Sequence, residues 1–268
     1  MTDPLVFVWR DQTVSLSNIP ATRTLLQLLR EDLNHSATKE GCNEGDCGAC
    51  TVVLGERQGQ QIRYSAVNSC IRLAHSIHGM ALWTAADLAS VDGTPHPVQQ
   101  ALHQCHASQC GFCTPGFAMS LFGMYQTRVL KGQSVTRDQA QEALSGNLCR
   151  CTGYRPILDA AQQMASLPKV EIDEARLLQQ LELLTQDKKG LGVNFSYKSP
   201  ESLGVLLSAR AAHPKAQIVA GCTDVGLWIN KLHMDFAQVL DVSRVAELRL
   251  IHTQEGHTQI GAAVTLTD

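Results

Sequence analysis

The chain has 268 residues, of which 44% are apolar, 18% charged and 5% aromatic. The length suggests two or three folded domains, and the low charged content with near-average apolar content is a poor fit to collagen-like, coiled-coil and disordered chains. The net charge of -3 provides no basic surface for nucleic acid or an anionic membrane, and no apolar run is long enough to span a bilayer. The start lacks the basic and apolar regions of a signal peptide, so we expect a cytoplasmic protein.

Residues 1–88 show short strand patterns around one helix. Two β-prone runs, Leu5–Trp9 and Thr13–Leu16, flank a polar turn, and Thr24–Glu31 has the leucine spacing of a helix. Further strands are expected in a hairpin of Thr51–Leu54 and Ile62–Ser65, and at Met80–Trp83. Together these elements predict a small mixed sheet with one crossing helix.

Residues 89–167 change to helical patterns. Glycines separate the runs, Thr136 begins a capping-box sequence, and Pro156 suits a first helical turn. We expect a compact helical bundle from Val98–His106, Gly116–Leu130, Thr136–Leu144 and Pro156–Ala165.

Residues 168–192 are densely charged around one amphipathic stretch, Ala175–Leu184, and end in a Gly-Leu-Gly sequence. This composition predicts a surface linker. In the remaining segment, 193–268, a strand at Gln217–Ala220 runs through a glycine turn into a helix at Val225–Leu232. Two further strands are expected there, at Val239–Val242 and Thr258–Ala263.

Nine of the ten cysteines lie between Cys42 and Cys151. In a reducing compartment such thiols more often bind metals or perform redox chemistry than form disulfides. The first group has the spacing C-x4-C-x2-C and a fourth, distant cysteine, which is the plant-type [2Fe–2S] ferredoxin pattern. Its expected ligands are Cys42, Cys47, Cys50 and Cys70.

A structural zinc site is the alternative for this first group, although zinc sites usually use two short cysteine pairs. A Rieske centre would need two histidines in place of two cysteines. No histidine occurs in residues 40–70, so we expect ligation by cysteine alone.

The second group has the spacing C-x2-C and C-x-C, with both pairs at expected helix ends. Free backbone N–H groups at helix termini favour anionic sulfur there. The spacing alone suits zinc, an iron–sulfur cluster or uninvolved thiols, and the neighbouring ferredoxin pattern favours a second cluster. These residues are Cys110, Cys113, Cys149 and Cys151.

Four sequence runs, 39–52, 96–101, 108–116 and 146–154, resemble the iron–sulfur portion of the molybdenum hydroxylases. Because a flavin-domain-like region follows on the same chain, the sequence most resembles the small subunit of a bacterial xanthine dehydrogenase. The resemblance extends over essentially the whole chain and is strongest over residues 39–158.

The resemblance implies an α+β multidomain protein. Its expected parts are a β-grasp [2Fe–2S] ferredoxin-like domain (1–88), a helical [2Fe–2S] domain (89–167), the linker (168–192) and the N-terminal part of an FAD-binding domain (193–268). The family's flavin domain continues beyond the position that matches Asp268, so we expect a shortened domain in this chain.

The resemblance also assigns roles to the two clusters. The first would lie nearer the flavin, and the second would be buried and nearer a molybdenum cofactor. Residues that match Gln109 and Cys151 approach that cofactor in the family. The molybdenum site, the substrate pocket and its catalytic residue would lie on a large partner subunit, so we expect none of them in this chain.

The run from Ile218 to Gly226 resembles the FAD loop of the family. A strand, a glycine turn and a helix can present backbone N–H groups to a diphosphate, although a single glycine turn of this kind is also common in ordinary loops. The expected contacts are Val219, Ala220, Gly221, Cys222, Thr223, Asp224 and Val225.

These observations predict an oxidoreductase subunit that passes electrons from a molybdenum cofactor on the partner through two clusters toward FAD and NAD, in purine catabolism. A second copy of the heterodimer is a further expected partner, whereas nucleic acid and membranes are not. The alternatives are the corresponding subunit of an aldehyde or other N-heterocycle hydroxylase, a free-standing ferredoxin-type carrier, and a zinc-stabilised interaction module.

Overall fold

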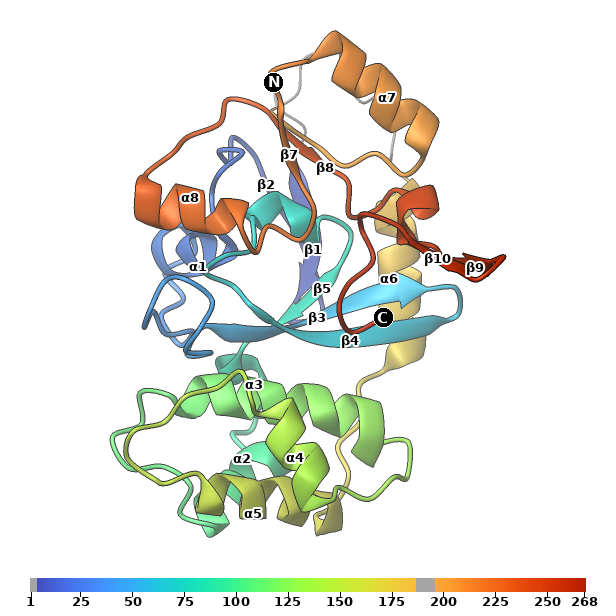
Figure 1. Cartoon of the computed structure of the whole chain (residues 1–268). Coiled ribbons are helices and arrows are strands. Elements are labelled where there is room, and N and C mark those ends of the chain that lie inside the picture. Colours follow the sequence, from blue (N-terminus) through green and yellow to red (C-terminus); the bar gives the residue numbers. More distant parts are fainter. Residues whose placement is uncertain (1–3, 187–195) are drawn as a thin grey trace.

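A computed structural model of the chain describes residues 4–186 and 196–268, except for the side chains of residues 185 and 186. A helical part lies at one end of the molecule and a five-stranded sheet in the middle (Figure 1). The C-terminal segment, residues 196–268, begins at the other end and returns beside the sheet, where Asp268 pairs with Arg63. Three expectations fall partly outside the described residues: the start of the first domain (1–3), the end of the linker (187–192) and the first residues of the last domain (193–195).

The central sheet has the strand order β2-β1-β5-β3-β4, in which β1 and β5 are parallel and the other pairs antiparallel. The hairpin is longer than predicted, because the pairing continues over residues 55–58 of β3 and over residue 61 and residues 66–68 of β4, the edge strand of the sheet. The strands are β1 (Leu5–Trp9), β2 (Gln12–Leu16), β3 (Thr51–Gln58), β4 (Gln61–Asn68) and β5 (Ala81–Trp83).

One short helix, α1 (Leu25–Gln27), crosses this sheet and continues as a wider helical turn at Leu28–Asp32. Thr24 begins it with a capping box, because its side chain accepts a hydrogen bond from the backbone N–H of Gln27. The leucines of both pieces are buried, as their spacing predicts. The predicted mixed sheet with one crossing helix is confirmed.

The helical part contains four helices, as predicted. Polar caps and prolines begin them: His96 caps α2, Thr136 caps α4, and prolines occupy the first turns of α3 and α5. The helices are α2 (Pro97–Gln104), α3 (Thr114–Met124), α4 (Arg137–Ala143) and α5 (Arg155–Gln163).

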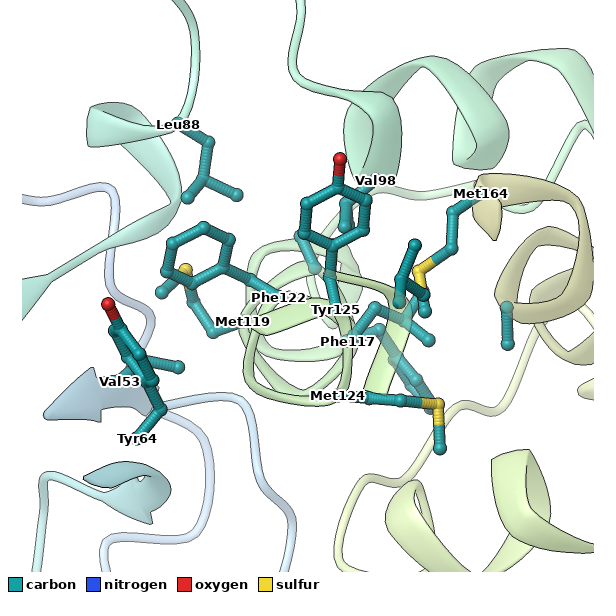
Figure 2. Packing of buried hydrophobic residues seen from close by; sticks show 14 of the residues in the cluster. Val53, Tyr64, Leu88, Val98, Phe117, Met119, Phe122, Met124, Tyr125 and Met164 are labelled. Atoms are coloured by element: carbon teal, nitrogen blue, oxygen red, sulfur yellow. The ribbon is translucent and has the colours of Figure 1, made fainter. Parts of the chain in front are cut away.

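Helix α3 is buried on all sides because it is apolar around its whole circumference. Phe122 of α3 packs toward the sheet residues Val53 and Tyr64, whereas Tyr125, just after α3, faces the other helices (Figure 2). The sheet and the helical part therefore share one hydrophobic core.

The segment that we expect to be a surface linker contains a packed helix, α6 (Glu174–Gln186). Leu177 and Leu181 are buried in the shared core, and Tyr64 donates a hydrogen bond to Glu174 at 2.8 Å. Helix α6 runs from the helical part back along the sheet (Figure 1). The amphipathic pattern in this charged segment thus marks a buried contact as well as a connection.

The C-terminal segment contains a parallel sheet of order β6-β8-β7 and a separate hairpin of β9 and β10. Helix α8 follows β7 at the predicted residues. Strands β6 and β9 and helix α7 are additional to the prediction. The elements are β6 (Tyr197–Lys198), α7 (Leu203–Ala212), β7 (Gln217–Val219), α8 (Val225–Leu232), β8 (Val239–Asp241), β9 (Ile251–Gln254) and β10 (His257–Ile260). In the described parts of the chain, no helix has the length and apolar character needed to cross a membrane.

Candidate iron–sulfur centres

The hairpin of β3 and β4 brings two of the predicted ligands together. Cys50 directly precedes β3 and Cys70 follows β4, and the register pairs Thr51 with Asn68, so both cysteines lie at the same end of the hairpin. Their thiols are close enough to share a hydrogen bond. This contact lowers the pKa of Cys50 to about 7 and raises the pKa of Cys70.

The other two predicted ligands of this site, Cys42 and Cys47, lie in the loop before β3. Backbone N–H groups of Glu44 and Cys47 donate to the Cys42 sulfur, each at 3.4 Å, and the N–H of Cys42 donates to the Cys47 sulfur at 3.4 Å. Burial works to raise the pKa of Cys42, but these donors outweigh it and lower that pKa. These donors therefore stabilise the Cys42 sulfur in its anionic form, whereas burial raises the pKa of Cys47.

The second group of cysteines lies before two helices. Cys110 and Cys113 precede α3, whereas Cys149 and Cys151 precede α5, as the sequence predicts. The thiols again lie in pairs, with Cys113 against Cys149 and Cys110 against Cys151.

The pKa values of Cys149 and Cys113 shift in opposite directions. Burial, followed by the neighbouring Cys149, raises the pKa of Cys113 to about 12. Burial also opposes ionisation of Cys149, but the hydroxyl and the backbone N–H of Thr152 lower its pKa. The Cys149 sulfur thus has donors that would stabilise a thiolate.

The grouping of the thiols fits two-iron clusters. All ten cysteines are free. A tetrahedral zinc site needs four ligands around one ion, whereas each iron of an all-cysteine [2Fe–2S] cluster takes two protein sulfurs. The pairs are Cys42 with Cys47, Cys50 with Cys70, Cys110 with Cys151, and Cys113 with Cys149.

A backbone hydrogen bond joins the two groups of cysteines. The N–H of Leu148, the residue before Cys149, donates to the carbonyl of Cys47 at 2.9 Å. Buried Asn147 supports this contact, because its side chain donates to the Gly48 carbonyl at 3.0 Å. The chain thus links a predicted ligand of one site to a predicted ligand of the other. No local sequence pattern reveals this link, although Asn147 and Leu148 lie within the 146–154 run.

Gly48 makes this close approach feasible. Its φ of +68° is a conformation that side chains with a Cβ disfavour, and a Cβ there would lie 2.3 Å from the carbonyl oxygen of Gly146. The cysteine loop and the helical part are therefore in direct backbone contact at this position.

The second group lies on an open face of this chain. Cys110 and Cys151 are exposed, and so are Gln109 and the apolar side chains of Phe112 (49%) and Leu148 (54%). Cys149, by contrast, is buried and Cys113 is half-buried. The expectation of a buried cluster is therefore met on one side of this group only, and the side of Cys110 and Cys151 is open.

The predicted FAD loop connects β7 to α8. Gly221 and Cys222 both have positive φ, +76° and +66°, which turn the chain sharply into the helix. The side chains of Val219, Cys222 and Val225 are buried in a cluster that also contains Ala21 and Leu73 of the first domain, so they offer only backbone groups to a ligand. Ala220, Gly221, Thr223 and Asp224 are exposed.

Three family models match the chain in succession. Residues 7–74 match a "2Fe-2S iron-sulfur cluster binding domain", and residues 84–162 match a "[2Fe-2S] binding domain". Residues 193–268 match an "FAD binding domain in molybdopterin dehydrogenase". The chain corresponds to the iron–sulfur and flavin-domain region of the molybdenum hydroxylases.

Relatives within the molybdenum hydroxylases are similar over nearly the whole chain. Xanthine dehydrogenase of Drosophila subobscura is 32% identical over 100% of this chain and 23% of its own length. Aldehyde oxidase 1 of Bos taurus is 30% identical over 98% of this chain and 23% of its own length. The chain thus spans about a quarter of the length of these relatives.

Solved structures of molybdenum hydroxylases share the fold. A chain of quinoline 2-oxidoreductase from Pseudomonas putida 86 matches with a TM-score of 0.52 and 29% identity, over 61% of this chain and 93% of that chain. Aldehyde oxidoreductase from Desulfovibrio gigas matches with a TM-score of 0.53 and 28% identity, over 65% of this chain and 18% of that chain. The mixed α/β multidomain architecture is therefore that of this family.

Proposed function

We propose that this chain is the electron-transfer part of a molybdenum hydroxylase of the xanthine dehydrogenase type. The observation that supports this function best is the backbone hydrogen bond between Leu148 and Cys47, which joins the two cysteine groups. Bound [2Fe–2S] clusters would supply one-electron transfer at both groups. The predicted ligands for the two clusters are the four cysteine pairs described above.

The chain's own residues hold and tune these groups. Backbone N–H donors from Glu44 and Cys47 stabilise negative charge on the Cys42 sulfur. Asn147 fixes the loop of the first group against the helical part, and the shared core prevents the two parts from separating. The separation of the two redox groups is therefore set by packed structure.

The open face around Cys110 and Cys151 is where we place the large partner subunit. Exposed apolar side chains such as Phe112 and Leu148 are typical of a surface that another chain covers. On this proposal the partner holds the molybdenum cofactor near Gln109 and Cys151. The substrate, a purine such as xanthine, binds in a pocket of the partner. The complex is cytosolic, passes its electrons to NAD, and consists of two associated heterodimers.

For FAD, we propose contacts from the exposed part of the loop between β7 and α8. Thr223 offers a hydroxyl, and the backbone around Gly221 offers N–H groups at the start of a helix, where negative charge is favoured. Val219, Cys222 and Val225 would support this loop from the core.

A free-standing ferredoxin-type carrier is not favoured by this architecture. The first group of cysteines belongs to a sheet whose core is completed by α3 of the helical part. Two cysteines of the second group, Cys110 and Cys113, directly precede α3. A carrier would need only the first group.

The composition of the purified complex tests the proposed function. We expect about four irons per chain with a matching amount of acid-labile sulfide, together with molybdenum on a larger partner and acid-releasable FAD. Anaerobic addition of xanthine should bleach the visible absorbance of the iron–sulfur centres. Stoichiometric zinc and a colourless protein would refute this function.

A further inference from the structure

The last turn of α8 contacts the loop of the first cysteine group. The side-chain amide of Asn230 donates to the carbonyl of Cys70 at 2.7 Å and to the carbonyl of Asn43 at 3.2 Å. Both acceptors belong to the predicted cluster-binding segments, whereas Asn230 belongs to the C-terminal segment. One side chain therefore ties two separate parts of the first site together.

Lys231 makes a second contact with the same loop. Its ammonium donates to the carbonyl of Cys42 at 2.8 Å and pairs with the Glu44 carboxylate at 3.1 Å. Glu44 is also the residue whose backbone N–H points at the Cys42 sulfur. Lys231 therefore holds both ends of the short turn that aims this N–H at the sulfur.

Close packing keeps α8 in this position. Gly226 in its first turn lies so near the backbone of Ile71 that a Cβ would be 2.7 Å from the Ile71 carbonyl oxygen. Leu227 packs against the small cluster of buried residues that contains Cys50 and Cys70. The helix therefore cannot shift along the loop without losing these contacts.

A purely structural role does not account for Lys231. Its side chain is 44% exposed and that of Glu44 is 40% exposed, and ion pairs at such sites contribute little to folding stability. A positive charge and a fixed N–H donor beside a sulfur ligand instead stabilise the more negative, reduced form of a cluster.

We propose that Asn230 and Lys231 of the C-terminal segment are positioning residues of the first iron–sulfur centre, and that they raise its reduction potential. This inference rests on the proposed function, because it requires a cluster at Cys42, Cys47, Cys50 and Cys70. It adds that the C-terminal segment forms part of that site.

The test is an anaerobic redox titration of the full chain with both centres loaded. In the Lys231→Met variant, the first centre should become harder to reduce. At a fixed ambient potential near its midpoint, its ratio of reduced to oxidised form should fall roughly twofold to tenfold, where tenfold corresponds to about 59 mV for one electron. The second centre should keep its potential and serve as the internal reference. The transition of the first centre is identified by its loss in Cys47→Ser.

Three further variants sharpen this test. Lys231→Arg keeps the charge and should restore most of the potential. Lys215→Met removes an exposed lysine in the turn between α7 and β7 and should leave both centres unchanged. Asn230→Asp keeps the size but removes the donor and sets a carboxylate against two carbonyls, so it should lower the potential of the first centre further.

Iron content separates the possible failures. If Lys231→Met and Asn230→Asp keep full iron and an unchanged potential of the first centre, the inference is wrong while the proposed function stands. An equal shift of both centres would also overturn it, because a local contact cannot act on both. If the unmodified chain binds no iron–sulfur cluster, the proposed function fails and this inference fails with it.

Discussion

Replacing Gly48 with alanine should separate the two cysteine groups. The new Cβ would lie 2.3 Å from the Gly146 carbonyl oxygen and 2.5 Å from the side-chain amide nitrogen of Asn147. Ordinary contacts need about 3.5 Å, so the loop and the helical part must move apart by roughly 1 Å. That movement weakens the hydrogen bonds from Leu148 to Cys47 and from Asn147 to Gly48.

The expected loss in free energy of unfolding has two separable parts. An alanine at positive φ costs about 1–2 kcal/mol wherever it occurs. Loss of two hydrogen bonds and forced repacking add about 2–4 kcal/mol at Gly48. Gly59 is a matched control, because its φ of +62° is similar to the +68° of Gly48 and nothing lies within 4 Å of its Cβ position. Gly59→Ala therefore measures the first part alone.

Urea unfolding followed by circular dichroism compares the two variants. We expect Gly48→Ala to have the lower free energy of unfolding by about 2–4 kcal/mol relative to Gly59→Ala. Electron exchange between the two centres should also slow in Gly48→Ala only. Equal free energies of unfolding and equal exchange rates in both variants would refute the close contact between the cysteine loops.

Three other changes have defined outcomes. Cys47→Ser should lose about half of the bound iron, whereas Cys105→Ser, outside both groups, should lose none; full iron in Cys47→Ser would contradict the ligand assignment. Phe112→Ser should weaken association with the molybdenum subunit roughly tenfold in pull-down titrations while iron is retained, and Leu207→Ser on α7 should not; equal binding by both would remove the proposed docking face. Burial lowers the pKa of His96 to about 4, whereas an unfolded histidine has a pKa of about 6.5. Between these two pH values the unfolded chain binds a proton on His96 that the folded chain does not. The free energy of unfolding therefore falls as the pH decreases through that window. Between pH 7.5 and 5 the unmodified chain should lose about 2 kcal/mol more than His96→Asn, which keeps a helix cap but does not titrate; parallel pH profiles would show that His96 is not the cause.

Most secondary structure was predictable because it depends on local patterns. Helix α8 has the predicted bounds, and the four helices of the bundle have recognisable caps and prolines. The failures have physical reasons. Strand β6 has two residues and is stabilised by pairing with β8, which lies far along the chain. Helix α6 is amphipathic within a charged segment, so composition alone suggested a linker.

The grouping of the cysteines was predictable from the sequence, whereas their surroundings were not. Cysteine spacing identifies the two groups because short loops must wrap a small cluster. The contacts that join the parts connect residues far apart in sequence, such as Leu148 with Cys47 and Asn230 with Cys70. No periodicity encodes such pairs, since they arise only when domains pack.

The core that the sheet shares with α3 has a consequence for how fast electrons could cross the protein. Tethered redox domains that swing between partners have rates limited by diffusion and slowed by viscous solvent. Here Phe122 lies in one core with Val53 and Tyr64 across the boundary, so the sheet and the helical part are packed directly against each other. Transfer between them should therefore proceed at the same speed in glycerol as in dilute buffer.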